Sequence, residues 1–178
     1  MKKYLFLLPL LTITLQSRAM DVQDQFLRAV GGGNMPVVRR LLLDSRIDIN
    51  ESSPNIVGQL PALHMAATEG MGNLALTQLL LDAGADVNVR DFFGETALFN
   101  VASPEIAKLL LDKGIDVSIK ENRTGFTAID KLESLNRAAR ARNANNLASR
   151  TEAILKTIKE HIQQQAQSRE NQTAASTK

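Results

Sequence analysis

The sequence predicts an all-α protein, a solenoid of about four stacked helix-turn-helix units joined by finger-like turns. Two repeated phrases support this prediction. One begins with three leucines and an aspartate, and it is written "LLLDSRIDIN" at 41–50, "LLLDAGADVN" at 79–88 and "LLLDKGIDVS" at 109–118. The other comes before it in two units, as "GQLPALHMAATEG" at 58–70 and "GETALFNVA" at 94–102. Units this small cannot bury an apolar side alone, so stacked copies must share one core.

The leucine phrases start 38 and 30 residues apart, which brackets the 33 residues of an ankyrin unit. The second phrase is similar to that family's turn-then-helix motif, and "GFTAIDKL" at 125–132 opens one more copy. Over roughly residues 21–165 the chain therefore resembles the ankyrin-repeat family. The resemblance implies two antiparallel helices per unit, finger turns between units, and a role in binding other proteins.

The repeats divide the chain into a leader at 1–19, a repeat domain at 20–165 and a tail at 166–178. The units are placed at about 21–50, 51–88, 89–118 and 119–165. The first and last units are expected to be atypical, because terminal units need a polar outer side. The tail has no apolar periodicity and is predicted to be disordered.

Several helix starts are written in the sequence. Asp21, Asn34 and Ser103 are predicted N-caps, and the last two are followed by a proline in the first turn. "SRTE" at 149–152 is a capping box for a final helix. The glycine run at 31–33 is an inter-helix turn; a phosphate-loop interpretation lacks the preceding strand and the Lys-Ser/Thr that would follow.

The leucine triplets are expected on the second helix of each unit, filling the seam between neighbours. Each such side chain contributes roughly 1.5–3 kcal/mol when buried. Gly84 and Gly114 are expected to end these helices in the left-handed conformation. Arg46 holds that place in the first unit, so its helix end should be less well formed. In the last unit, Leu132 and Leu135 should line the first helix.

The first nineteen residues read as a secretory signal peptide. Two lysines precede a mostly apolar run from 4 to 15, and Ser17-Arg18-Ala19 provides a small-x-small cleavage pattern, with cleavage expected after Ala19. An uncleaved anchor is the alternative, but the run is shorter than a bilayer span. The style of the leader is bacterial, which predicts a periplasmic or secreted protein that leaves the membrane after cleavage.

Charge and cysteine content exclude several classes. Without the leader, 18 basic side chains stand against 19 acidic ones, which disfavours nucleic-acid binding in spite of "RAARAR" at 137–142. The charge is uneven: residues 20–118 hold 7 basic and 13 acidic side chains, and residues 119–178 hold 11 and 6. The chain has no cysteine, so disulfides and thiolate chemistry are impossible.

No catalytic, cofactor or metal site is predicted. The chain has two histidines, and the family resemblance assigns His64 to hydrogen bonds within and between turns, a structural role. Asp48, Asp86 and Asp116 recur because the repeat recurs, and each is expected to bond the backbone at the base of a finger. An enzyme is therefore not expected.

Binding residues are sought on the finger tips at 50–60, 88–95 and 118–126, and on the concave side of the first helices. One ring of the Phe92-Phe93 pair, Phe93, is expected to tuck against the next turn and leave Phe92 exposed; the alternative packs both rings. The candidate contacts are Ile56, Val57, Arg90, Phe92, Phe93, Glu95 and Arg123. Met65, Thr68, Glu69 and Asn100 are further concave candidates.

The sequence thus favours a non-enzymatic, exported module that is a monomer when unbound and docks one protein partner. The resemblance and the leader together lead us to expect a role as an inhibitor, as an immunity partner or as the protector of an enzyme. The alternative is a secreted effector that binds host proteins.

Overall fold

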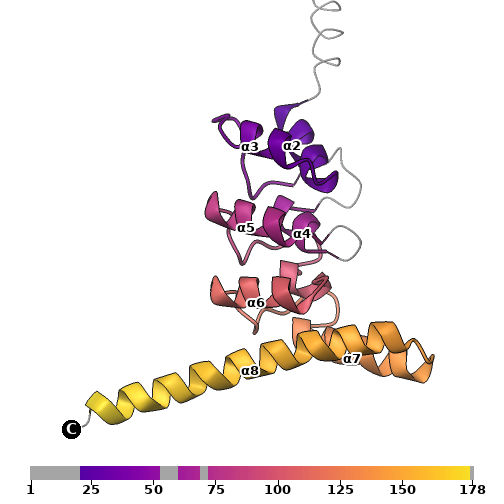
Figure 1. Ribbon diagram of the computed structural model, residues 1–178, viewed down its shortest axis with the longest axis vertical. Coiled ribbons are helices and arrows are strands. Elements are labelled where there is room, and N and C mark those ends of the chain that lie inside the picture. Colours follow the sequence, from indigo (N-terminus) through magenta and orange to yellow (C-terminus); the bar gives the residue numbers. More distant parts are fainter. Residues whose placement is uncertain (1–20, 53–59, 69–71, 177–178) are drawn as a thin grey trace, which may run out of the picture.

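The computed structural model describes residues 21–52, 60–68 and 72–176, and it is a stack of helix pairs (Figure 1). The elements are α2 (Val22–Gly31), α3 (Met35–Leu41), α4 (Ala62–Ala67), α5 (Leu74–Asp82), the 3-10 helix η1 (Ala97–Asn100), α6 (Pro104–Asp112), α7 (Ala128–Ala141) and α8 (Asn145–Ser176). The second helices of the first three units, α3, α5 and α6, lie in one column (Figure 1). The predicted all-α repeat solenoid is confirmed.

One continuous apolar core runs through the stack, because each unit buries apolar side chains against the next. Leu80 and Leu110, the middle leucines of two phrases, are fully buried. The largest fully buried side chains are Phe26, Leu27, Val30, Val38, Leu63, Leu76, Leu80, Leu98, Ile106, Leu110, Ile154 and Ile158, which come from every unit. The core is therefore shared by all four helix pairs.

The first leucine phrase departs from the other two. α3 ends at Leu41, whereas α5 and α6 continue to the aspartate of their phrases. In α5 and α6 the glycine that follows has a positive φ, +94° at Gly84 and +86° at Gly114. Arg46 takes this place in unit one, and its side chain pairs with Asp44 at 2.7 Å. The helix ends early, so Leu43 is 87% exposed, and the prediction that it fills a seam is wrong.

A ladder of hydrogen bonds joins the bases of the fingers, and it explains the end of the repeated phrase. The carboxylates of Asp48, Asp86 and Asp116 each accept from the backbone N–H two residues later, as predicted. The asparagine two residues later reaches the next unit: Asn50 Oδ1 accepts from the N–H of Asp86 at 2.8 Å, and Asn88 Oδ1 from that of Asp116 at 2.7 Å. The phrase therefore stacks units as well as closing turns.

The predicted caps at Asp21, Asn34 and Ser103 are confirmed, since each side chain accepts from a backbone N–H in the first turn. The first helix of unit three is a single 3-10 turn, η1. The chain after it is extended, and Ala102 donates to the carbonyl of Ala67 at 2.9 Å. This short connection explains how the unit folds although its leucine phrase follows the previous one after only 30 residues.

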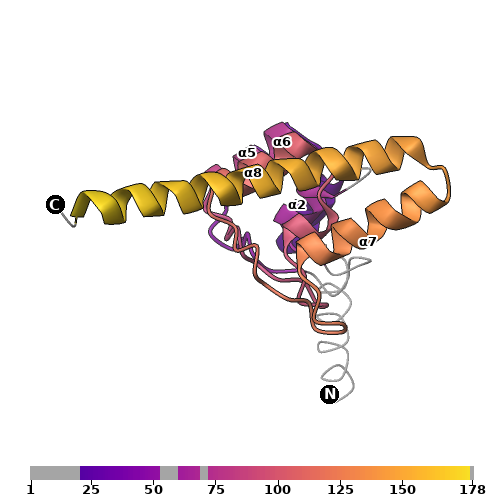
Figure 2. The same ribbon diagram turned by 90° about the horizontal axis from the view of Figure 1, so that it is seen from below.

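The last unit is a long hairpin that closes the stack. α8 packs against both α6 and α7 (Figure 2). Its Ile154 and Ile158 are fully buried. The capping box lies at the start of α7, where Thr127 and Asp130 exchange hydrogen bonds. The predicted box at 149–152 is wrong: α8 begins at Asn145, so these residues lie inside the helix.

The tail, for which the sequence predicts disorder over 166–178, is helical as far as Ser176, because α8 continues to that residue and projects beyond the stack (Figure 2). The packed first half of α8 supplies the helical nucleus, and each further residue adds a hydrogen bond at little cost. Glutamine, alanine, arginine and glutamate, which are frequent after residue 162, favour this continuation.

Some predictions fall outside the described residues. These are the leader at 1–19, the tip of the first finger with Ile56 and Val57, and Glu69. In the part of the chain that the structure describes, no helix combines the length and the apolar character needed to cross a bilayer.

Candidate functional site

The finger at 88–95, here the second finger, is held rigid by one aspartate. Asp91 Oδ1 accepts from the N–H groups of Phe93 and Glu95, both at 2.9 Å. The backbone closes the same turn, because Asp91 N–H donates to the carbonyl of Glu95 at 3.0 Å. The tip therefore presents its side chains in a fixed arrangement.

Both rings at this tip are exposed. Phe92 is 75% exposed and Phe93 56%, and their centroids lie 5.5 Å apart in an edge-to-face arrangement. The expectation that Phe93 tucks against the next turn is wrong. Its backbone carbonyl makes that contact, accepting from the N–H of Asn122 at 2.9 Å, so the ring is left in solvent.

Arg90 joins the second finger to the finger at 118–126, here the third finger. Its Nε donates to the carbonyl of Gly94, and one terminal nitrogen donates to the carbonyl of Lys120 and to Asn122 Oδ1, at 3.0–3.1 Å. A side chain with these bonds positions the fingers. Arg90, which the sequence analysis names as a candidate contact, therefore braces the two fingers.

The third finger is closed by its own carboxylate. Glu121 accepts from the N–H of Arg123 at 2.7 Å and from the N–H and hydroxyl of Thr124. The Thr124 hydroxyl, followed by the Arg123 N–H, lowers the pKa of Glu121 to about 2. Glu121 is therefore ionised at ordinary pH, and its carboxylate oxygens are hydrogen-bonded within the turn.

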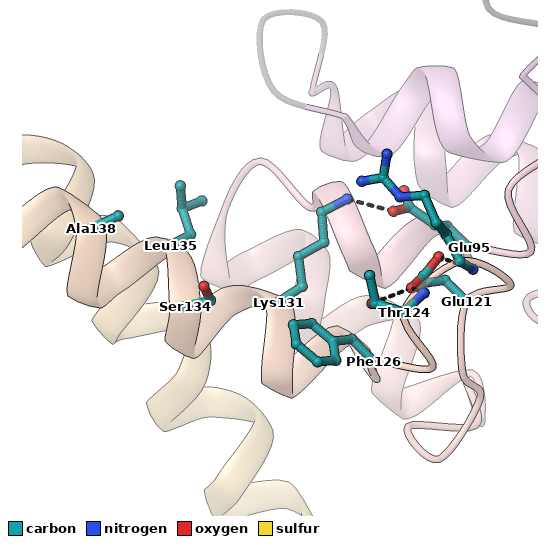
Figure 3. A pocket seen from close by; sticks show the side chains of 9 residues that line it. Glu95, Glu121, Thr124, Phe126, Lys131, Ser134, Leu135 and Ala138 are labelled. Atoms are coloured by element: carbon teal, nitrogen blue, oxygen red, sulfur yellow. Dashed lines mark hydrogen bonds and ion pairs between the residues drawn. The ribbon is translucent and has the colours of Figure 1, made fainter.

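A pocket of about 410 Å³ lies between the third finger and α7 (Figure 3). Phe126 and Leu135 provide its apolar surface and are 46% and 39% exposed. The lining residues are Glu95, Glu121, Arg123, Thr124, Phe126, Lys131, Ser134, Leu135 and Ala138. Two predicted contacts, Glu95 and Arg123, meet here, while Phe92 and Phe93 lie on the neighbouring finger.

Three polar side chains form a closed triangle at one end of this pocket. Lys131 Nζ donates to Glu95 Oε1 at 2.6 Å and to Asn100 Oδ1 at 3.1 Å, and Asn100 Nδ2 donates to Glu95 Oε2 at 2.7 Å. Lys131 also lies 5.8 Å above the ring of Phe99. Figure 3 shows the lysine reaching from α7 toward Glu95. The triangle leaves Glu95 and Lys131 neutral as a pair.

His64 lies beneath this network, fully inside the stack. Its Nε2–H donates to the backbone carbonyl of Glu95 at 2.9 Å, which is the inter-unit role expected of it. Its Nδ1 is buried and has no partner within the described residues. Burial lowers the pKa of His64, so the imidazole is neutral in the folded protein.

The other histidine lies on α8 and has two polar neighbours. His161 Nε2 bonds the Gln165 amide at 2.8 Å, and its Nδ1 lies 3.9 Å from Asp112. Among the residues that the structure describes, no three histidine or carboxylate side chains are grouped as metal ligands. Two surface features of the described residues are suited to binding: the exposed rings of the second finger and the pocket between the third finger and α7.

The sequence interpretation missed Phe126 and the exposure of Leu135. Leu135 was assigned to the helix interior with Leu132, but only Leu132 is buried. The available signal was helical spacing: Lys131, Leu135 and Ala138 follow at intervals of four and three, which is one side of α7. Residues that share this side with a lysine face a polar groove.

The family model for ankyrin repeats (3 copies) matches residues 26–121 and 63–149 of the chain. The search among curated proteins found no match. Proteins built from these repeats are in general non-enzymatic modules that bind other proteins, which accords with a surface of rigid fingers and a groove. With its repeat phrases, its stacked helix pairs and a family match over more than half of its length, this chain belongs to the ankyrin-repeat family.

Proposed function

We propose that the protein is exported through its N-terminal leader and that the mature chain, from residue 20, is a non-enzymatic module docking one protein partner. Cleavage after Ala19 releases it from the membrane into the periplasm or the medium, where it is a monomer until it binds. In binding, it inhibits the partner, acts as an immunity protein that neutralises a toxin, or protects a partner that is an enzyme.

The exposed pair Phe92 and Phe93 is the single observation that carries this proposal. Large apolar side chains in water on a rigid turn are anchors for a partner, since aromatic residues dominate binding energy at protein interfaces. Asp91 and Arg90 fix the backbone of the tip. A preorganised tip loses little conformational entropy on binding, which favours association with a folded protein.

Affinity capture tests the proposal. The tagged mature chain is recovered from periplasm and medium of the native host, and its N-terminus is sequenced; the expected first residue is Met20. A stoichiometric protein should copurify with it, burying an interface of about 1,600 Å² in total.

Replacement of Phe92 and Phe93 by serine should remove that protein from the eluate. Leu43→Ser is the matched control, because Leu43 is at least as exposed but lies at the other end of the stack. If no protein copurifies under several growth conditions, or if the double variant retains its partner in full, the proposed docking function is refuted.

A further inference from the structure

We propose that the groove between the third finger and α7 binds an acidic segment of the partner protein, with apolar side chains seated on either side of Leu135 and a carboxylate paired with Arg123. This inference rests on the proposed function and specifies the chemistry of what is bound. It is carried by the shape of the groove and by which of its charges are already engaged.

The shape of the groove is suited to a chain segment. The pocket of about 410 Å³ lies within the range, about 300–1,000 Å³, of sites that enclose side chains or small molecules. A smaller pocket of about 100 Å³, lined by Thr68, Phe99 and Ile154 among others, continues from it toward α8. Lys131 and Leu135 line both pockets. A segment lying across Leu135 would place one apolar side chain in each.

The carboxylates of the groove already have hydrogen-bond partners within the protein. The carboxylate of Glu95 is held by Lys131 and Asn100, and that of Glu121 by the backbone and hydroxyl of its own finger. Neither carboxylate is available to attract a basic side chain without breaking several hydrogen bonds. A basic partner segment would have to compete with these internal donors for each carboxylate oxygen.

Of the two basic side chains that line the larger pocket, that of Lys131 is held by Glu95, whereas that of Arg123 is free in the described structure. Arg123 lines the larger pocket and is exposed, and within the described part of the chain its guanidinium makes no ion pair or hydrogen bond. Arg142, four residues after Ala138, continues the same side past the end of α7 and is equally unpaired among the described residues. Arginine presents a planar fork of donors that matches a carboxylate. The groove therefore selects acidic segments.

Selection from a library of random short peptides displayed on phage tests this inference. The library is panned on the immobilised mature chain, and the enriched peptides are synthesised with a fluorescent label for anisotropy titration. The enriched pool should be net negative and should contain paired Leu, Ile, Met or Phe residues. Raising the ionic strength should weaken binding several-fold, because the charges at the rim are screened.

Two groove variants and one control locate the contact. Leu135→Asp and Arg123→Glu should each weaken peptide binding about tenfold or more. The first places a charge where the apolar side chains of the peptide pack, and the second turns attraction for the peptide carboxylate into repulsion. Arg39→Glu makes the same charge change on α3, at the other end of the stack, and should leave the affinity unchanged. Circular dichroism verifies that all three variants are folded.

A neutral or basic pool, no enriched pool, or peptides indifferent to Leu135→Asp and Arg123→Glu would each overturn the inference. These failures are distinct from failure of the proposed function, which is decided by capture of a protein and by the Phe92 and Phe93 variants. A partner that docks only on the second finger would preserve the function and refute the acidic segment.

Discussion

The third leucine of the repeated phrase is buried in one unit and exposed in another, although the sequence is the same. Leu111 is 3% exposed and packs in the shared core, whereas Leu43, at the same place in the first phrase, is 87% exposed. Leu111→Ala removes three buried carbons, worth about 2.4 kcal/mol at roughly 0.8 kcal/mol each. The cavity left behind adds to this, so the expected loss is about 2–5 kcal/mol. Leu43→Ala should change stability by less than about 0.5 kcal/mol.

Urea denaturation followed by far-UV circular dichroism measures both losses. The transition midpoint of Leu111→Ala should fall with little change in slope, and that of Leu43→Ala should remain that of the parent chain. Equal losses from the two variants would contradict the early end of α3, because Leu43 would then be packed as its counterpart is.

Three further outcomes follow from the stack. Asn88→Ala removes the acceptor for the Asp116 N–H and should cost about 0.5–1.5 kcal/mol in the same denaturation assay, with Gln78→Ala, on the exposed side of α5, nearly neutral. Gly114→Ala should cost about 1–2 kcal/mol although space is open around it, because only the positive φ resists the change; a lower melting temperature reports it. The unfolding free energy should fall as pH drops below about 6.5, because the unfolded chain protonates a histidine whose folded pKa is lowered, and His64→Asn should flatten this slope.

Repetition made most of the fold predictable. The spacing of the repeated phrases gives the length of a unit, and the apolar positions that recur in each phrase indicate the core. The departures occur where one copy lacks a residue that the others have. Without a glycine at position 46, α3 ends early, and Leu43 leaves the core. The full length of α8 was missed because apolar periodicity reports packing, whereas a projecting helix is maintained by propensity and by its packed nucleus.

The site was only partly predictable. Glu95 and Arg123 were identified because they lie on fingers, and they do share a pocket. Phe126 and Leu135 were missed because their exposure depends on how α7 sits against the third finger, a tertiary contact that the phrase does not encode. Phe92 is exposed, as predicted, but which atoms of Phe93 meet the third finger depended on the backbone of the turn.

Glu95 occupies a place where three units meet: its carbonyl receives the imidazole of His64, and its carboxylate holds Lys131. A ligand in the groove that displaces Lys131 from the Glu95 carboxylate changes the charge distribution around Glu95. Because the carbonyl of the same residue accepts the Nε2–H of His64, the electrostatic environment of the imidazole changes as well. The ring resonances of His64 in an NMR spectrum should therefore shift when a ligand occupies the groove, although His64 is buried and does not contact the ligand. The fold contains its own spectroscopic reporter of occupancy, and only one other histidine is present to confuse the signal.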